Sequence, residues 1–190
     1  LTRPARPWLV APTLTGAGLR LREWRTSDLE AVEEREHPEH WTPSSTLRPA
    51  NADEWLTRTW EGAAEGTSVT WCVADEASDR ALGYVAVFRR DGATLGAGDD
   101  AELGYTVFPS ARGRGVAAAA TRLVVDHVTS PRERGGLGLR RLTAMTSADN
   151  AGSNAVLRGR GFGVCGHEHA TDALPDGSWA DCLRWERLSR

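Results

Sequence analysis

Alternating apolar and polar residues mark several segments of this chain as β-strands. Residues 19–24 (Leu-Arg-Leu-Arg-Glu-Trp) alternate as a half-buried strand does. Two runs rich in β-branched and aromatic residues, 69–74 and 81–88, flank a turn-like stretch at 75–80, which predicts an antiparallel hairpin. Strand patterns also cover residues 101–108, 139–146, 162–169 and 179–188.

Helical patterns lie between these strands. Thr26 precedes acidic residues as a helix cap does, and a second helix is predicted to begin at Asn51. Asn150 can cap a short helix that continues through Arg158. The helix after Gly115 carries one face made of Val116, Ala120, Leu123, Val124 and His127.

This order of elements predicts one domain built on a mixed α/β sheet. A chain of 190 residues is long enough for one ordinary domain and short for two. Pro4, Pro7 and Pro12, together with a lone Trp8, predict an irregular N-terminal arm over residues 1–17. The domain is therefore expected to span residues 18–190.

Composition and charge exclude several classes of function. The hydrophobic fraction of 40% and the charged fraction of 26% are typical of a globular protein. The formal charge of -3 provides no general attraction for nucleic acid or for an anionic membrane. No apolar stretch is long enough to span a membrane or to form a signal peptide, so a cytoplasmic protein is expected.

Cysteine and histidine spacing does not predict a metal site. Cys72, Cys165 and Cys182 are odd in number and lack the C-x-x-C spacing of zinc sites. His167 and His169 would project from one face of a strand, but no third ligand is evident beside them in the sequence. We therefore expect no metal.

The stretch Ala-Arg-Gly-Arg-Gly-Val-Ala-Ala-Ala-Ala at residues 111–120 leads directly into a helix. The first amide groups of a helix have no internal partner and attract anions, and glycines allow a ligand to approach them closely. Arg112 and Arg114 add positive charge beside Gly113 and Gly115. A plain connection between strand and helix would explain the same residues, but the pattern also predicts a phosphate-binding turn.

The same turn satisfies G-x-G-x-x-A at Gly113, Gly115 and Ala118, as in dinucleotide-binding folds. Those folds need an acidic residue at the end of the next strand. Glu133 has the spacing but lies in the polar stretch 131–138, which counts against this alternative.

The residues 112–117, Arg-Gly-Arg-Gly-Val-Ala, resemble the Q/R-x-x-G-x-G/A motif of the GCN5-related N-acetyltransferase (GNAT) superfamily. Residues 148–162 resemble the N-x-x-S segment of its ribosomal-protein alanine acetyltransferase-like (RimJ/RimL-like) branch, and 174–188 resemble that branch's D-G-x-W-x-D tail. The resemblance implies a mixed, mostly antiparallel sheet of about seven strands flanked by about four helices.

By this resemblance, one set of residues binds acetyl-CoA. The turn would hold the diphosphate through Arg112, Gly113, Arg114, Gly115, Val116, Ala117 and Ala118. Val107 and Phe108 would pair with the pantetheine arm, much as a strand pairs with a sheet edge. Asn150 and Asn154 would approach the cofactor, although Asn150 would also serve as a simple helix cap.

The resemblance also implies two catalytic residues. Glu102 would act as general base, which requires partial burial because a carboxylate is a weak base for an ammonium group. Ser153 would protonate the leaving thiolate. The alternatives are an ordinary surface glutamate and an exposed helical serine.

The implied function is direct transfer of an acetyl group from acetyl-CoA to a primary amine of a protein N-terminus or a small molecule. Two alternatives are a non-catalytic acyl-CoA-binding module of the same fold and an NAD(P)-dependent oxidoreductase. Trp41, beside His37 and His40, lies where the family shapes its acceptor pocket, with simple packing as the alternative. Members of the family are often dimers, so a homodimer is left open.

Overall fold

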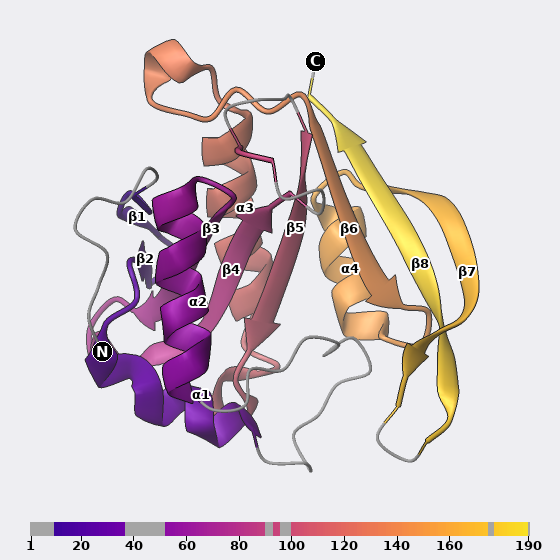
Figure 1. Ribbon diagram of the computed structural model, residues 1–190, viewed down its shortest axis with the longest axis horizontal. Coiled ribbons are helices and arrows are strands. Elements are labelled where there is room, and N and C mark those ends of the chain that lie inside the picture. Colours follow the sequence, from indigo (N-terminus) through magenta and orange to yellow (C-terminus); the bar gives the residue numbers. More distant parts are fainter. Residues whose placement is uncertain (1–9, 37–51, 90–92, 96–99, 175–176, 190) are drawn as a thin grey trace.

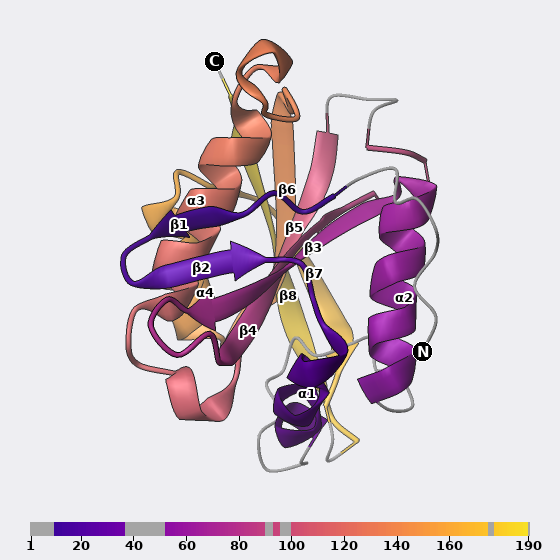
Figure 2. The same ribbon diagram turned by 90° about the vertical axis from the view of Figure 1, so that its left-hand side faces the viewer.

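The chain forms a three-layer α/β structure in which one sheet separates two pairs of helices (Figures 1 and 2). The computed structural model describes residues 10–36, 52–89, 93–95, 100–174 and 177–189. The strands are β1 (Leu14–Gly16), β2 (Leu19–Arg22), β3 (Ser68–Asp75), β4 (Ala81–Phe88), β5 (Asp100–Val107), β6 (Arg141–Ser147), β7 (Gly163–Ala173) and β8 (Trp179–Leu188). The helices are α1 (Leu29–Glu36), α2 (Ala52–Glu65), α3 (Val116–Thr129) and α4 (Ala151–Gly159).

The eight strands follow the order β1-β2-β3-β4-β5-β6-β8-β7. Every neighbouring pair is antiparallel except β5 and β6, which are parallel. The predicted mixed, mostly antiparallel sheet is confirmed, and so is the hairpin of residues 69–74 and 81–88, which is β3–β4. The sheet has eight strands rather than about seven because β1 was not predicted.

The expectation of an irregular arm over residues 1–17 was wrong for Leu14–Gly16, which pairs with Leu19–Leu21 as β1. Ala17 and Gly18 join the two strands with φ of +54° and +73°. Both residues of a type I′ turn have positive φ, which is usually signalled by Asn-Gly or Asp-Gly. Because alanine occupies the first turn position, the usual dipeptide signal is missing and this hairpin was not predicted.

Two apolar cores lie on opposite faces of the sheet. On one face α3 packs with its apolar positions, including the fully buried Val124 and Val128, against Trp71 and Leu103, and Leu157 of α4 joins this core. On the other face α1 and α2 pack over a second core that contains Trp24, Leu56 and Phe108. The predicted apolar face of the helix after Gly115 is therefore the one that covers the sheet.

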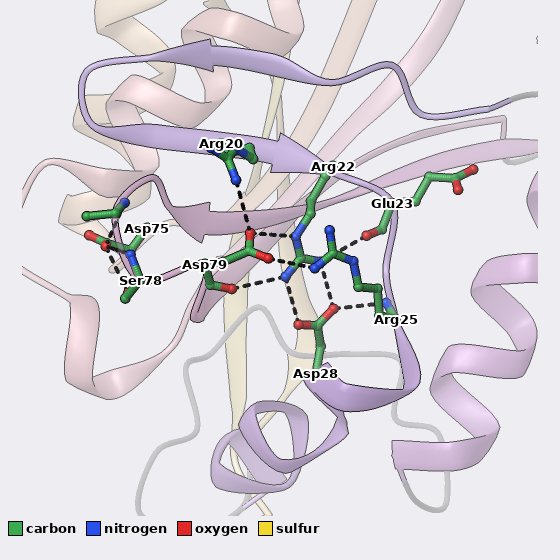
Figure 3. A network of polar contacts seen from close by, with 9 residues as sticks. Arg20, Arg22, Glu23, Arg25, Asp28, Asp75, Ser78 and Asp79 are labelled. Carbon is green, nitrogen blue, oxygen red and sulfur yellow. Dashed lines mark hydrogen bonds and ion pairs between the residues drawn. The ribbon is translucent and has the colours of Figure 1, made fainter.

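A buried arginine links β2 to the turn before α1 and to the β3–β4 turn through hydrogen bonds (Figure 3). The Arg22 guanidinium donates two hydrogen bonds to the Asp28 carboxylate, at 2.8 and 2.9 Å, and a third to Asp79 Oδ1 at 2.9 Å. A bidentate contact of this kind fixes geometry as well as charge. Asp79 has φ of +56°, a conformation that aspartate tolerates better than most residues.

Candidate active site

The sheet opens between β5 and β6, the one parallel pair in its strand order. Their pairing covers only Asp100↔Arg141 to Glu102↔Thr143. Beyond this point β5 stays with β4 as far as Val107, whereas β6 stays with β8 as far as Ser147. The two strands therefore separate, as Figure 1 shows, and leave one side of β5 without a neighbouring strand.

A cavity of about 330 Å³ lies at this opening. Three parts of the chain line it: the end of β5, the turn that enters α3 with that helix's first residues, and the start of α4. The lining residues are Tyr105, Thr106, Val107, Ala111, Arg112, Gly113, Gly115, Val116, Ala117, Ala118, Asn150, Gly152, Ser153 and Val156.

The glycine turn presents bare main chain to the cavity. Gly113 and Gly115 have φ of +71° and +76°, and Gly115 is the N-cap of α3 without any side-chain cap. An added Cβ would meet nothing within 4 Å at either position, so the glycines are required by backbone conformation rather than by crowding. The first hydrogen bond of α3 runs from Ala119 N–H to Gly115 C=O, so the N–H groups of residues 116–118 have no partner inside the helix. Such groups form an anion site.

Arg112 joins this turn to the end of β5. Its Nε donates a hydrogen bond of 3.1 Å to the carbonyl oxygen of Val107. Arg112 is itself exposed and lines the cavity. A positive charge therefore lies beside the anion site.

The start of α4 forms the opposite wall. Asn150 is the N-cap of this helix, and its Oδ1 accepts a hydrogen bond of 3.0 Å from the Ser153 amide, which confirms the predicted cap. Ser153 is half-buried. The Tyr105 hydroxyl donates a hydrogen bond of 3.1 Å to the Ser153 carbonyl oxygen. Burial raises the pKa of Tyr105 to about 12, so its phenol stays a neutral donor.

The structure brings most of the predicted site residues to one cavity. These are Val107, Arg112, Gly113, Gly115, Val116, Ala117, Ala118, Asn150 and Ser153.

Phe108, Arg114, Asn154 and Glu102 are not among the lining residues. Phe108 is buried in the core beneath α1 and α2, and Arg114 is exposed. Asn154 is buried; its Oδ1 accepts a hydrogen bond of 2.6 Å from the Thr146 hydroxyl, and its Nδ2 donates one of 2.9 Å to Ala148 C=O. The predicted approach of Asn154 to the cofactor therefore does not match its packing.

Glu102 lies where β5 and β6 begin to separate. It is the last residue of β5 that pairs with β6, opposite Thr143, and it also pairs with Phe88 of β4. Its side chain is half-buried. Strand alternation puts it on the face of α1 and α2, opposite to Leu103.

Sequence analysis missed several residues of the cavity wall, notably Tyr105, Thr106, Gly152 and Val156. Tyr105 and Thr106 precede the predicted Val107 on the same strand, and Gly152 and Val156 flank Ser153 on the same helix. Strand and helical periodicity around the predicted residues could have indicated that these neighbours also line the cavity.

The expectation that His167 and His169 have no third ligand group beside them was wrong. The Asp181 carboxylate of the neighbouring strand β8 lies 3.0 Å from a ring nitrogen of each histidine. Trp8, His37, His40 and Trp41 lie outside the described residues. Among the described helices, none is long and apolar enough to cross a membrane.

Comparison with known proteins agrees with this architecture. A family model described as an acetyltransferase (GNAT) domain matches residues 18–163, which is most of the chain. Among curated proteins, none matches this sequence.

Solved structures of similar fold include ribosomal-protein acetyltransferases. One is a ribosomal-protein-S5-alanine acetyltransferase from Vibrio fischeri, with 18% identity, a TM-score of 0.76, and coverage of 94% of this chain and 97% of that one. Another is an L7/L12 N-terminal serine acetyltransferase from Salmonella typhimurium, with 18% identity, a TM-score of 0.74, and coverage of 94% and 100%. A third is RimL, an L7/L12 α-N-protein acetyltransferase, in complex with coenzyme A, with 19% identity, a TM-score of 0.76, and coverage of 93% and 98%.

Identities this low show a shared fold, and the family follows from the model match and from the glycine turn beside the opened sheet. The chain belongs to the GNAT family of acetyl-CoA-dependent N-acetyltransferases.

Proposed function

We propose that this enzyme transfers the acetyl group directly to a primary amine, either of a protein N-terminus or of a small molecule. The observation that carries the proposal is that one cavity is lined by the turn into α3, by the end of β5 on its open side and by Ser153. Ribosomal-protein acetyltransferases among the structures of similar fold favour a protein N-terminus as acceptor.

The residues of the cavity suit two parts of acetyl-CoA, the diphosphate and the pantetheine arm. The free N–H groups at residues 116–118 and the Arg112 guanidinium offer donors and positive charge to the diphosphate. The main-chain N–H group of Val107, on the side of β5 that has lost its partner strand, can pair with an amide of the pantetheine arm. Both interactions use main-chain groups, and in the turn the glycines leave these groups accessible.

Acetyl-CoA supplies an activated thioester, and the chain's own residues must handle two protons. We assign Ser153 as the group that donates a proton to the leaving thiolate, because Ser153 is half-buried and lines the cavity at the start of α4. We assign Glu102 as the base that receives a proton from the acceptor amine. Because Glu102 does not line the cavity, this transfer would run through an intervening water.

An acetyl-transfer screen over N-terminal peptides and small amines, with mass detection of acetylated product, tests the function. We expect acetylation of at least one amine and a thermal shift with acetyl-CoA but none with NAD or NADP. Binding of acetyl-CoA without transfer to any amine would favour the non-catalytic module. No binding of acetyl-CoA would contradict the assignment of the cavity.

A further inference from the structure

The ribbon formed by β7 and β8 carries a compact cluster of two imidazoles and one carboxylate. His167 and His169 lie on β7, the edge strand of the sheet, and Asp181 lies on β8 (Figure 1). His167 Nε2 and His169 Nδ1 each lie 3.0 Å from Asp181 Oδ2. The three potential ligand atoms all lie within 4.8 Å of one another.

A β-bulge orients the carboxylate of this cluster. The pairing of β7 with β8 shifts register between Glu168 and Asp172, and Ala170 within the bulge has φ of +51°. The Ala170 amide donates a hydrogen bond of 2.9 Å to Asp181 Oδ1. This bond occupies one carboxylate oxygen and leaves Oδ2 directed at both imidazoles. An ionised carboxylate with one oxygen held by a second group is the usual arrangement of a metal ligand.

The donor set and spacing match a tetrahedral transition-metal ion. Zinc binds imidazole nitrogen and carboxylate oxygen at about 2.0–2.2 Å, which puts neighbouring ligand atoms of a tetrahedron about 3.3–3.6 Å apart. Here each histidine nitrogen lies 3.0 Å from Asp181 Oδ2, and all three ligand atoms lie within 4.8 Å of one another. The tetrahedral spacing falls between these two values. Two nitrogen ligands also disfavour Mg²⁺ and Ca²⁺, which prefer oxygen.

We propose that His167, His169 and Asp181 form a binding site for a zinc-class divalent ion, with water in the fourth position. The ion replaces the protons that bridge the imidazoles to Asp181, which are released to solvent. It thereby cross-links β7 and β8. The exposure of both histidines gives the ion direct access from solvent. None of the three residues lines the acetyl-CoA cavity, so this site is separate from the proposed active site.

The site is nonetheless connected to the helix that bears Ser153. The carbonyl oxygen of Asp181 accepts a hydrogen bond of 2.7 Å from the Ala148 amide. Ala148 in turn accepts a hydrogen bond of 2.9 Å from the Asn154 side chain on α4. Coordination of the ion by Asp181 would therefore restrain the position of the segment that precedes α4.

Titration of the untagged, metal-free full chain with ZnCl₂ tests the proposal, with a chromogenic chelator as competitor and thermal unfolding as a second measurement. We expect one equivalent to bind. Saturation at about 100 times the Kd should raise the Tm by roughly 5–10 °C, reversibly on addition of EDTA. MgCl₂ at the same concentration should give no shift.

Variants decide whether these three residues are the ligands. His167→Ala, His169→Ala and Asp181→Ala should each weaken zinc binding at least about tenfold. Glu168→Gln is the matched control, because Glu168 lies between the two histidines and pairs instead with Arg184. It should bind zinc as the wild type does.

Three outcomes would overturn the proposal. The first is the absence of a stoichiometric zinc site in the wild type, and the second is unchanged binding in all three ligand variants. The third is binding that Cys165→Ser abolishes, since Cys165 is an exposed thiol on the same strand. Circular dichroism of each variant separates loss of ligand from loss of fold.

Discussion

The Tyr105 hydroxyl donates a hydrogen bond to the Ser153 carbonyl oxygen and so links β5 to α4 across the opened part of the sheet. The two walls of the cavity are held at a fixed spacing by this contact. Its position beside a proposed catalytic serine makes it a positioning interaction, since the phenol acts through the backbone of α4.

Tyr105→Phe should therefore lower the free energy of unfolding by about 1 kcal/mol and reduce kcat severalfold. Because burial raises the pKa of Tyr105 to about 12, the phenol is protonated at ordinary pH, and the variant should keep the shape of the wild-type pH–rate profile. Urea unfolding and steady-state kinetics across pH measure both effects. A changed pH profile would instead point to proton transfer by Tyr105 itself.

Ser153→Ala should lower kcat by about 100-fold while the Kd for acetyl-CoA changes by less than about twofold. The reason is that the proposed proton donation to the thiolate occurs during transfer and contributes little to binding of the cofactor. Ser153→Thr keeps a hydroxyl at the same helical position and should retain much more activity. Equal loss of affinity and rate in the alanine variant would reject the role of Ser153 as acid.

Glu102→Gln should remove the acidic limb of the pH–kcat/KM profile and lower kcat/KM by about 100-fold, because an amide cannot accept the proton of the amine. Glu133→Gln, at an exposed glutamate far along the chain in the turn after α3, is the control and should be neutral. Rates measured from about pH 5 to 9 give the comparison. An unchanged profile in Glu102→Gln would show that another group is the base.

The order of strands and helices was predictable because alternation and helical periodicity are local properties of the sequence. The two sides of the cavity were also predictable, since Gly113, Gly115, Asn150 and Ser153 lie within short motifs. The site residues that could not be predicted are those whose positions depend on pairing between distant segments. Asp181 joins His167 and His169 only through the register of β8, and Tyr105 reaches α4 only because β6 leaves β5 after Glu102.

Asn154 is the opposite case. It directly follows the N-x-x-S motif of residues 150–153, which suggested a cofactor contact, yet its buried side chain accepts a hydrogen bond from Thr146 and donates one to Ala148. A buried polar side chain must be satisfied by a partner, and a motif does not reveal whether that partner is a ligand or the protein itself.

Gly115→Ala should destabilise the fold by about 1–2 kcal/mol, because φ of +76° strains any residue with a Cβ. Ala17 and Ala170 adopt similar φ values, so the variant should still fold. Gly159→Ala, at an exposed glycine that ends α4 without positive φ, is the matched control and should leave stability unchanged or slightly higher. Thermal unfolding of both variants, with and without acetyl-CoA, checks the values. Equal stability of Gly115→Ala and the wild type would mean that the turn relaxes.

Asp172 is predicted to limit the stability of the protein at neutral pH. Its side chain is 1% exposed, and within the part of the chain that the structure describes neither carboxylate oxygen has a hydrogen-bond partner. Burial raises the pKa of Asp172 above its unfolded value. The folded state therefore holds the proton more tightly, so the stabilising effect of that proton is fully present below the unfolded pKa and is lost as pH rises through the folded pKa.

Asp172→Asn should consequently be more stable than the wild type at neutral pH, and the difference should shrink as pH falls toward 4. Asp79→Asn provides a control of opposite sign. The hydrogen bond from Arg22 is the main cause that lowers the pKa of Asp79, so its contribution to stability is present above the unfolded pKa and is lost as pH falls through the folded pKa. That variant should be less stable than the wild type at neutral pH, again with a difference that shrinks in acid. Urea unfolding from about pH 2 to 8 measures both, because the difference for Asp79→Asn shrinks only below the unfolded pKa of an aspartate, about 3.9. Destabilisation by Asp172→Asn at neutral pH would show that the buried carboxylate is satisfied in solution.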